Sequence, residues 1–139
     1  MQTLANSPTQ TLVYIVDDEP MIGNLVGTYL QMEGFEVEVF DQPWVAWAAF
    51  RIANPKPDLL LTDFRMPGMS GLELIAACRR LHPSLKTISI SGTMSSEDME
   101  AAGVKPDRFV RKPFNPSALL QPIAELLGGG HVEHDVANR

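Results

Sequence analysis

The chain has 139 residues, of which 45% are hydrophobic and 20% are charged, and its formal net charge is -6. This size and composition are typical of one globular domain, and no apolar run approaches the roughly 20 residues that a membrane-spanning helix needs. The net negative charge and the lack of a Lys/Arg cluster argue against a nucleic-acid surface on this domain.

The two ends of the chain differ in composition from its middle. Residues 1–10 are polar and lack the basic-then-apolar order of a signal peptide, so we expect a cytoplasmic protein. Its single cysteine, Cys78, cannot form a disulfide within the chain and lies among Leu and Ala, which favours a buried small apolar residue. We expect residues 11–127 to form the domain and residues 128–139 to be a flexible tail.

The first predicted strand is followed at once by acidic residues. Residues 11–16 form a compact apolar run, and Asp17 and Asp18 come directly after it. Apolar residues then recur at helical spacing from Pro20 until Gly34, which supplies a stop.

The next strand and helix have different exposures. Residues 35–39 alternate Phe or Val with Glu, which predicts a half-exposed strand at a sheet edge. A second helix is expected over residues 42–52. We expect its large or apolar side chains to pack in the core rather than bind a cofactor; they are Trp44, Trp47, Ala48 and Phe50.

Residues 57–68 are the most informative stretch of the sequence. Their apolar run is bounded by Pro-Lys-Pro and Pro-Gly, which predicts a strand buried on both faces in a parallel sheet. The run ends in Asp63, and the carboxyl ends of such strands are where open α/β folds place ligands and chemistry. Asp63 is therefore the first functional candidate, although an isolated Asp is more often a turn-former or a helix cap.

A third helix is expected after a loop over residues 64–70. Ser70 and Glu73 have the spacing of a capping box, and the helix should end near Pro83. Residues 86–91 alternate as a strand and stop at Gly92. The segment over residues 95–102 is the weakest helix, which we expect to be marginal and mobile.

The last predicted units carry a lysine and two helix-modifying prolines. A short strand over residues 108–111 leads to Lys112, and Asn115-Pro116 opens the final helix. Pro122 lies inside that helix and lacks a backbone donor, so a kink or a locally broken turn is expected there.

The order of elements is a strand followed by a helix, repeated five times. Short repeats of this kind predict a parallel sheet with right-handed connections and helices on both faces. All strand carboxyl ends then point to one edge, which collects the following side chains: Asp17, Asp18, Asp63, Ser91 and Lys112.

These side chains suggest phosphoryl-transfer chemistry. Carboxylates gathered at one edge repel one another unless a cation neutralises them, and all-oxygen ligands that leave room for water and phosphate favour Mg²⁺. Lys112 can pair with a phosphoryl oxygen or with Asp63, and the Ser91 hydroxyl can donate to the same oxygen. A carboxylate oxygen of Asp63 would then be the nucleophile and would form an aspartyl phosphate.

The chain resembles the receiver domain of two-component response regulators over about residues 12–127. The resemblance rests on motifs at four strand ends, in the right order: Asp17-Asp18, Asp63-Phe64-Arg65-Met66-Pro67-Gly68-Met69-Ser70-Gly71, Ser91-Gly92 and Lys112-Pro113-Phe114. It implies an α/β, flavodoxin-like, doubly wound sheet of five parallel strands in the order 2-1-3-4-5 with five helices. Residues 11–127 would be the receiver domain.

The resemblance also implies a role for each site residue. Asp63 would accept a phosphoryl group from a phosphohistidine of a sensor kinase or a histidine phosphotransfer protein. Asp18 and Asp63 would bind Mg²⁺ directly, Asp17 would act mainly through water, and Arg65 would contribute its backbone oxygen. Lys112 would hold a phosphoryl oxygen, and its bond to Pro113 is expected to be cis.

In this family phosphorylation draws the Ser91-type hydroxyl toward the phosphate, and an aromatic residue on the fifth strand follows it inward. That aromatic is Phe109 here, whereas many relatives carry Tyr, so the hydroxyl that reports its position is lost. Phe109 could equally be a plain strand aromatic. The shift would alter the face formed by the fourth helix, fifth strand and fifth helix, and so control a partner or output domain.

Two other function classes compete with this phosphorylation switch. A haloacid-dehalogenase-type phosphatase also uses an Asp nucleophile and Mg²⁺, but it needs an acid two residues later, where this chain has Arg65. A phosphorylation-independent interaction module usually lacks one of the acids or the lysine, and none is missing here. The protein would be an enzyme only in catalysing its own phosphorylation and dephosphorylation. The sequence identifies neither its kinase nor its output.

Overall fold

A computed structural model of the protein describes residues 10–92, 97, 100–101 and 103–128. The strands in this part are β1 (Leu12–Val16), β2 (Glu36–Phe40), β3 (Leu59–Asp63), β4 (Lys86–Ser91) and β5 (Arg108–Arg111). The helices are α1 (Pro20–Met32), α2 (Pro43–Ile52), α3 (Gly71–Leu81), a 3-10 turn η2 (Pro116–Leu119) and α5 (Leu120–Leu126). The expected fourth helix over residues 95–102 lies largely outside the described residues, as do nearly all of the residues expected to form the polar lead and the tail.

The five strands form one parallel sheet in the order β2-β1-β3-β4-β5, which confirms the predicted α/β topology. β3 lies at the centre, and all five of its residues are buried. β2 lies at the edge, with Glu36 and Glu38 exposed and Val37 and Val39 half-buried. The alternation in its sequence therefore identified an edge strand correctly, because one of its faces is open to water.

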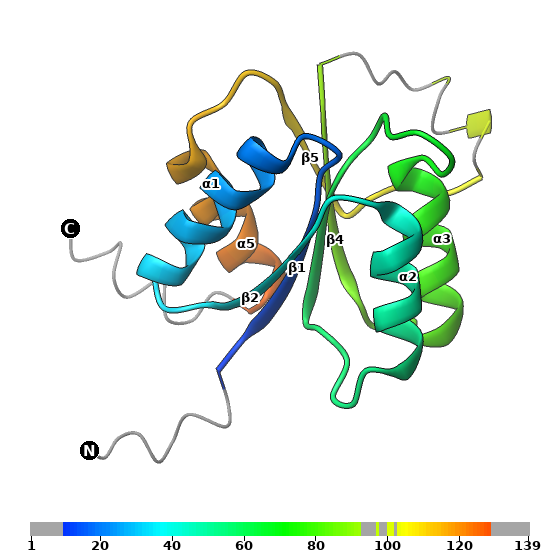
Figure 1. The fold of residues 1–139 in the computed structure, drawn as a ribbon, viewed down its shortest axis with the longest axis horizontal. Coiled ribbons are helices and arrows are strands. Elements are labelled where there is room, and N and C mark those ends of the chain that lie inside the picture. The colour runs from blue at the N-terminus through cyan, green and yellow to red at the C-terminus, as the bar shows by residue number, and fades with distance from the viewer. Residues whose placement is uncertain (1–9, 93–96, 98–99, 102, 129–139) are drawn as a thin grey trace.

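Helices cover both faces of the sheet. Figure 1 shows α1 and α5 on one face and α2 and α3 on the other. Successive strand residues point to opposite faces, so β3 sends Leu59 and Leu61 into the core beneath α1 and α5 and Leu60 into the core beneath α2 and α3. The predicted apolar character of Cys78 is confirmed, because it is 1% exposed in the second of these cores.

The expectation for the aromatic residues of α2 was wrong in part. Phe50 is fully buried and Trp47 stacks on it at 6.5 Å, but Trp44 is 56% exposed and Ala48 is also exposed. The buried positions of α2 are Pro43, Ala46 and Phe50. They set the core-facing stripe at spacings of three and four residues, and Trp44 lies about 100° away from Pro43 around the helix.

The start of the last helical segment has the broken turn that Pro122 predicts. Residues 116–119 form the 3-10 turn η2, and the α-helix begins only at Leu120. In one continuous α-helix the N–H of residue 122 would donate to the carbonyl of Ala118, and proline has no such N–H. The junction between η2 and α5 lies where that bond would be missing.

Candidate functional site

Five of the seven predicted site residues, namely Asp17, Asp18, Asp63, Ser91 and Lys112, lie at the carboxyl ends of four parallel strands. Asp63 and Ser91 are the last residues of β3 and β4, whereas Asp17 and Lys112 directly follow β1 and β5. Parallel strands end at the same edge of a sheet, which is why local strand signals were enough to predict this grouping. The structure thus brings the predicted residues to one rim.

Three carboxylates form a cluster at this rim. Asp17, Asp18 and Asp63 each offer an oxygen, and these oxygens all lie within 4.8 Å of one another. Asp17 and Asp63 are 4% and 6% exposed, while Asp18 is half-buried. The backbone N–H of Glu19 donates to Oδ1 of Asp17 at 2.9 Å, which fixes the first carboxylate beside the start of α1.

Lys112 supplies the positive charge that faces this cluster. Its Nζ lies 3.0 Å from Oδ1 of Asp63, and its backbone N–H donates to the carbonyl of Ser91 at 3.1 Å. β4 lies between β3 and β5, so the Lys112 side chain reaches Asp63 across the end of an intervening strand. The Lys112–Pro113 peptide bond is cis, as the resemblance implied.

The pKa values of the site follow from burial and from this ion pair. Burial raises the pKa of Asp17 to about 6, and it also raises the pKa of Asp63 despite the hydrogen bond from Lys112. For Lys112, burial acts to lower the pKa, but the hydrogen bond and the charge of Asp63 outweigh it and raise the pKa. The carboxylates are thus costly to ionise together without a cation.

This donor set fits Mg²⁺. Three carboxylates offer hard oxygen ligands only, and their mutual repulsion is relieved by a small divalent cation. The Arg65 backbone carbonyl remains a predicted fourth ligand. The Arg65 guanidinium lies over the Phe64 ring at 5.1 Å, and the side chain of Arg65 is therefore held beside the loop that follows β3.

Gly71 packs directly against the backbone of Asp63, a role that sequence analysis missed. Its N–H donates to the Phe64 carbonyl at 2.8 Å, and a Cβ added to it would overlap the carbonyl oxygen of Asp63. The predicted capping box between Ser70 and Glu73 is confirmed and starts α3 at this residue. A glycine at the first helical position, directly after a serine cap, was the signal that could have revealed the close approach.

The two predicted switch residues differ in exposure. Ser91 is 3% exposed at the end of β4, whereas Phe109 is 37% exposed in the middle of β5. Phe109 lies beside Ser89 in the strand register, and Ser91 lies beside Arg111. Their coupling through phosphorylation stays a prediction.

The comparison with known families decides what kind of domain this is. The family model of the response regulator receiver domain matches residues 13–124. The chain belongs to this family. Across the part of the chain that the structure describes, no helix of the receiver domain is long and apolar enough to cross a membrane.

Relatives of this receiver domain include longer regulators. The chain is 34% identical to the phosphate regulon transcriptional regulatory protein PhoB of Pseudomonas aeruginosa over 121 residues, which covers 83% of the chain and 51% of PhoB. It is 34% identical to the transcriptional regulatory protein FixJ of Rhizobium meliloti over 137 residues, which covers 94% of the chain and 65% of FixJ. The chain therefore spans about half to two thirds of the length of these relatives.

A solved structure of matching size is also similar. The CheY-like response regulator receiver domain protein of Methanospirillum hungatei has a TM-score of 0.77 and 31% identity to this receiver domain. The match covers 90% of this chain and 99% of the other. The fold seen here is thus the CheY-like receiver fold.

Proposed function

We propose that this receiver domain is a phosphorylation-controlled switch in which Asp63 accepts a phosphoryl group from a phosphohistidine. The observation that carries the proposal is the placement of Asp63. Its buried carboxylate lies within 4.8 Å of the Asp17 and Asp18 carboxylates, and its Oδ1 lies 3.0 Å from the Lys112 ammonium. An anionic nucleophile that contacts both an ammonium group and a metal-ligand set suits phosphoryl transfer.

In the proposed reaction an oxygen of Asp63 attacks phosphorus while the P–N bond of the donor breaks. The electron pair of that bond goes to the imidazole nitrogen, and Asp63 becomes an acyl phosphate. Lys112 moves its hydrogen bond from the carboxylate to a phosphoryl oxygen. Asp17, Asp18, Asp63 and the Arg65 carbonyl would hold Mg²⁺, which supplies charge neutralisation for the phosphoryl oxygens. Water later cleaves the acyl phosphate and returns Asp63.

Phosphorylation of Asp63 would also produce the conformational change that signals to a partner. Ser91 would donate to the new phosphoryl group, and Phe109 would move inward from its exposed position and reshape the face around β5 and α5. We propose that a sensor kinase or a histidine phosphotransfer protein is the donor in the cytoplasm. The phosphorylated form would be recognised by a partner protein or, as the longer relatives suggest, by an attached output domain.

Intact mass spectrometry after incubation with acetyl phosphate and Mg²⁺ tests this function. We expect the wild type to gain one phosphoryl group, and we expect no gain in Asp63→Asn or after chelation of Mg²⁺. A wild type that stays unmodified both with acetyl phosphate and with a phosphorylated kinase would contradict the proposal. Labelling that persists in Asp63→Asn would place the acceptor elsewhere.

A protein donor must also dock beside Asp63, and one apolar groove borders the site. It has a volume of about 210 Å³ and is lined by Ile22, Leu25, Val26, Lys112, Pro113, Phe114 and Pro116. Leu25 is 58% exposed there, and Met21, one turn earlier on α1, is 83% exposed. Exposed apolar side chains beside a reaction site are candidates for partner contact.

Leu25→Glu is expected to slow phosphoryl transfer from a kinase by about tenfold or more, because a charge would replace an apolar contact near the centre of the docked surface. The measurement is the rate of Asp63 labelling by a phosphorylated kinase, with acetyl phosphate labelling as a check that the site is intact. Met32→Glu is the matched control, since Met32 is 76% exposed at the other end of α1. Equal slowing by both variants would contradict docking at this groove.

A further inference from the structure

β5 is the shortest of the five strands and lies at an edge of the sheet. It has four residues at the end of the sheet order, and Arg108, Phe109 and Arg111 are exposed. Yet Lys112 directly follows it and must reach Asp63 across β4, over two strand spacings of about 4.8 Å each. The position of the Lys112 ammonium therefore depends on how β5 is fixed against β4.

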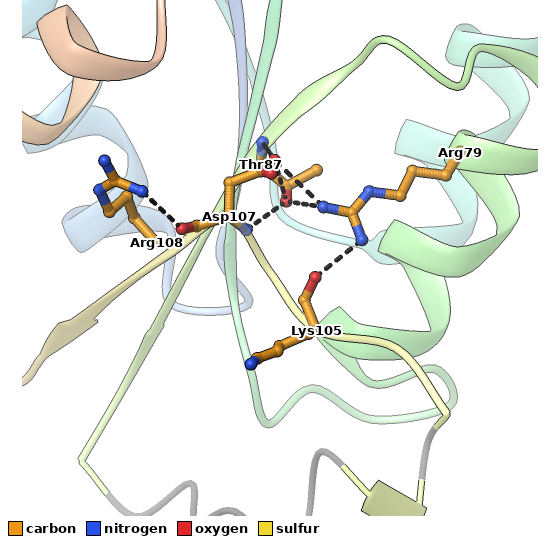
Figure 2. Close-up of polar contacts among 5 residues, drawn as sticks. All are labelled: Arg79, Thr87, Lys105, Asp107 and Arg108. Carbon is orange, nitrogen blue, oxygen red and sulfur yellow. Dashed lines mark hydrogen bonds and ion pairs between the residues drawn. The ribbon is translucent and has the colours of Figure 1, made fainter.

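A polar network ties down the amino end of β5 (Figure 2). Oδ2 of Asp107 accepts hydrogen bonds from the Thr87 backbone N–H at 2.8 Å and from the Thr87 hydroxyl at 3.1 Å. In return, the Asp107 backbone N–H donates to the Thr87 hydroxyl at 3.1 Å and lies 3.1 Å from the Thr87 carbonyl. Thr87 and Asp107 thus bond each other in both directions at the entry to the two strands.

Arg79, on α3, is the third residue of this network. Its Nη2 donates to the Thr87 hydroxyl at 2.9 Å and pairs with Oδ2 of Asp107 at 3.1 Å. Its Nη1 donates to the carbonyl of Lys105 at 2.7 Å, two residues before Asp107. One planar guanidinium therefore bonds both Asp107, directly before β5, and Lys105 in the segment that leads into it, through two different nitrogen atoms.

The network is stronger than a solvent-exposed ion pair. The side chains of Arg79 and Asp107 are only 25% and 32% exposed, and the guanidinium and the carboxylate both hydrogen-bond the Thr87 hydroxyl. Burial opposes ionisation of Asp107, but the hydrogen bonds from Thr87 and the charge of Arg79 outweigh it and lower the pKa of Asp107. The carboxylate is therefore charged at neutral pH and makes charge-assisted hydrogen bonds.

We propose that Asp107 and Arg79 are positioning residues for phosphoryl transfer at Asp63, because they fix the register of β5 and thereby hold Lys112 in reach of the nucleophile. This inference rests on the proposed function. Asp107 lies five residues before Lys112, and β5 lies between them. A shift of the backbone at Asp107 would therefore move β5 along β4 and displace Lys112. A slip of one residue would turn every β5 side chain to the opposite face.

The first test is the acetyl phosphate reaction of Asp107→Asn and Arg79→Gln at saturating Mg²⁺ and saturating acetyl phosphate. We expect the maximal labelling rate to fall between about tenfold and hundredfold, since small misplacements of a reacting group have effects of this size. Calorimetric titration with Mg²⁺ should give the wild-type affinity. The three carboxylates follow β1 and end β3, whereas Asp107 directly precedes β5 and Arg79 lies on α3.

Two further variants separate positioning from general damage. Glu125→Gln removes another β5 ion pair, Arg108–Glu125 at 3.5 Å, and should label at the wild-type rate. In a Lys112→Met background, Asp107→Asn should cause no further loss, because its effect acts through Lys112. All rates are compared at a temperature at which circular dichroism shows every variant folded.

The results that would contradict this inference differ from those that would contradict the proposed function. Equal losses from Asp107→Asn with and without Lys112, or Mg²⁺ affinity that falls with the rate, would assign the network a general structural role and overturn the inference. A labelled wild type with an unchanged Asp107→Asn rate would overturn it too, and would leave the proposed function standing. A wild type that takes up no phosphoryl group from either donor overturns both.

Discussion

Gly71→Ala is expected to abolish most phosphorylation of Asp63 and to lower the free energy of unfolding by about 1–3 kcal/mol. The added methyl group would overlap the Asp63 carbonyl oxygen and come within 3.2 Å of the Phe64 Cα, both of which are backbone atoms. Alanine has the better helix propensity, by up to about 1 kcal/mol, so propensity alone predicts the opposite sign. The clash outweighs it, because backbone cannot move aside as a flexible side chain can.

The measurements are a urea titration and the acetyl phosphate labelling rate at Asp63. Gly92→Ala is the matched control, since a Cβ there would lie at ordinary contact distance, 3.8 Å from the Cβ of Lys112. A Gly71→Ala variant that is as stable and as reactive as Gly92→Ala would show that the β3–α3 loop relaxes around the methyl group. That result would remove Gly71 from the support of the site.

Without Mg²⁺, the protein is expected to lose about 3 kcal/mol of unfolding free energy through Asp17 as pH rises from about 4 to above 6. Burial raises the pKa of Asp17 to about 6 in the folded state, against 3.8 for the free side chain. The folded state therefore binds more protons than the unfolded state in this window, and stability falls as pH rises. Burial of Asp63 acts in the same direction.

Mg²⁺ should offset this loss at neutral pH, because it stabilises the ionised carboxylates that are costly to bury alone. Urea titrations across this pH range, with and without Mg²⁺, provide the measurement. Asp17→Asn should flatten the pH dependence and reduce the stabilisation by Mg²⁺, whereas Asp41→Asn, at an exposed site, should behave as wild type. If the unfolding free energy of Asp17→Asn depends on pH as that of the wild type does, Asp17 is not the source of the stability loss.

Local patterns in the sequence determined most of the framework. Apolar runs with turn residues at their ends predicted all five strands, and the alternation of residues 35–39 marked the edge strand. These signals are readable because a strand's burial depends on periodicity within a few residues. They also predicted that the acids and Lys112 meet at one rim, since parallel strands share their carboxyl edge. The phase of α2 was misjudged because a shift of one residue turns a helix face by about 100°.

The strand order was implied by the family resemblance, since periodicity does not say which strands are neighbours. That order decides the contacts that only the tertiary structure reveals. The 3.0 Å ion pair between Lys112 and Asp63 crosses β4, and the Arg79–Asp107 pair joins residues 28 positions apart. Gly71 meets the Asp63 backbone only because the loop after β3 turns back onto the strand end. The sequence alone thus determined the reactive groups and the edge at which they gather. Their distances, and the residues that hold them in place, were decided by packing between segments far apart in the chain, which no local pattern encodes.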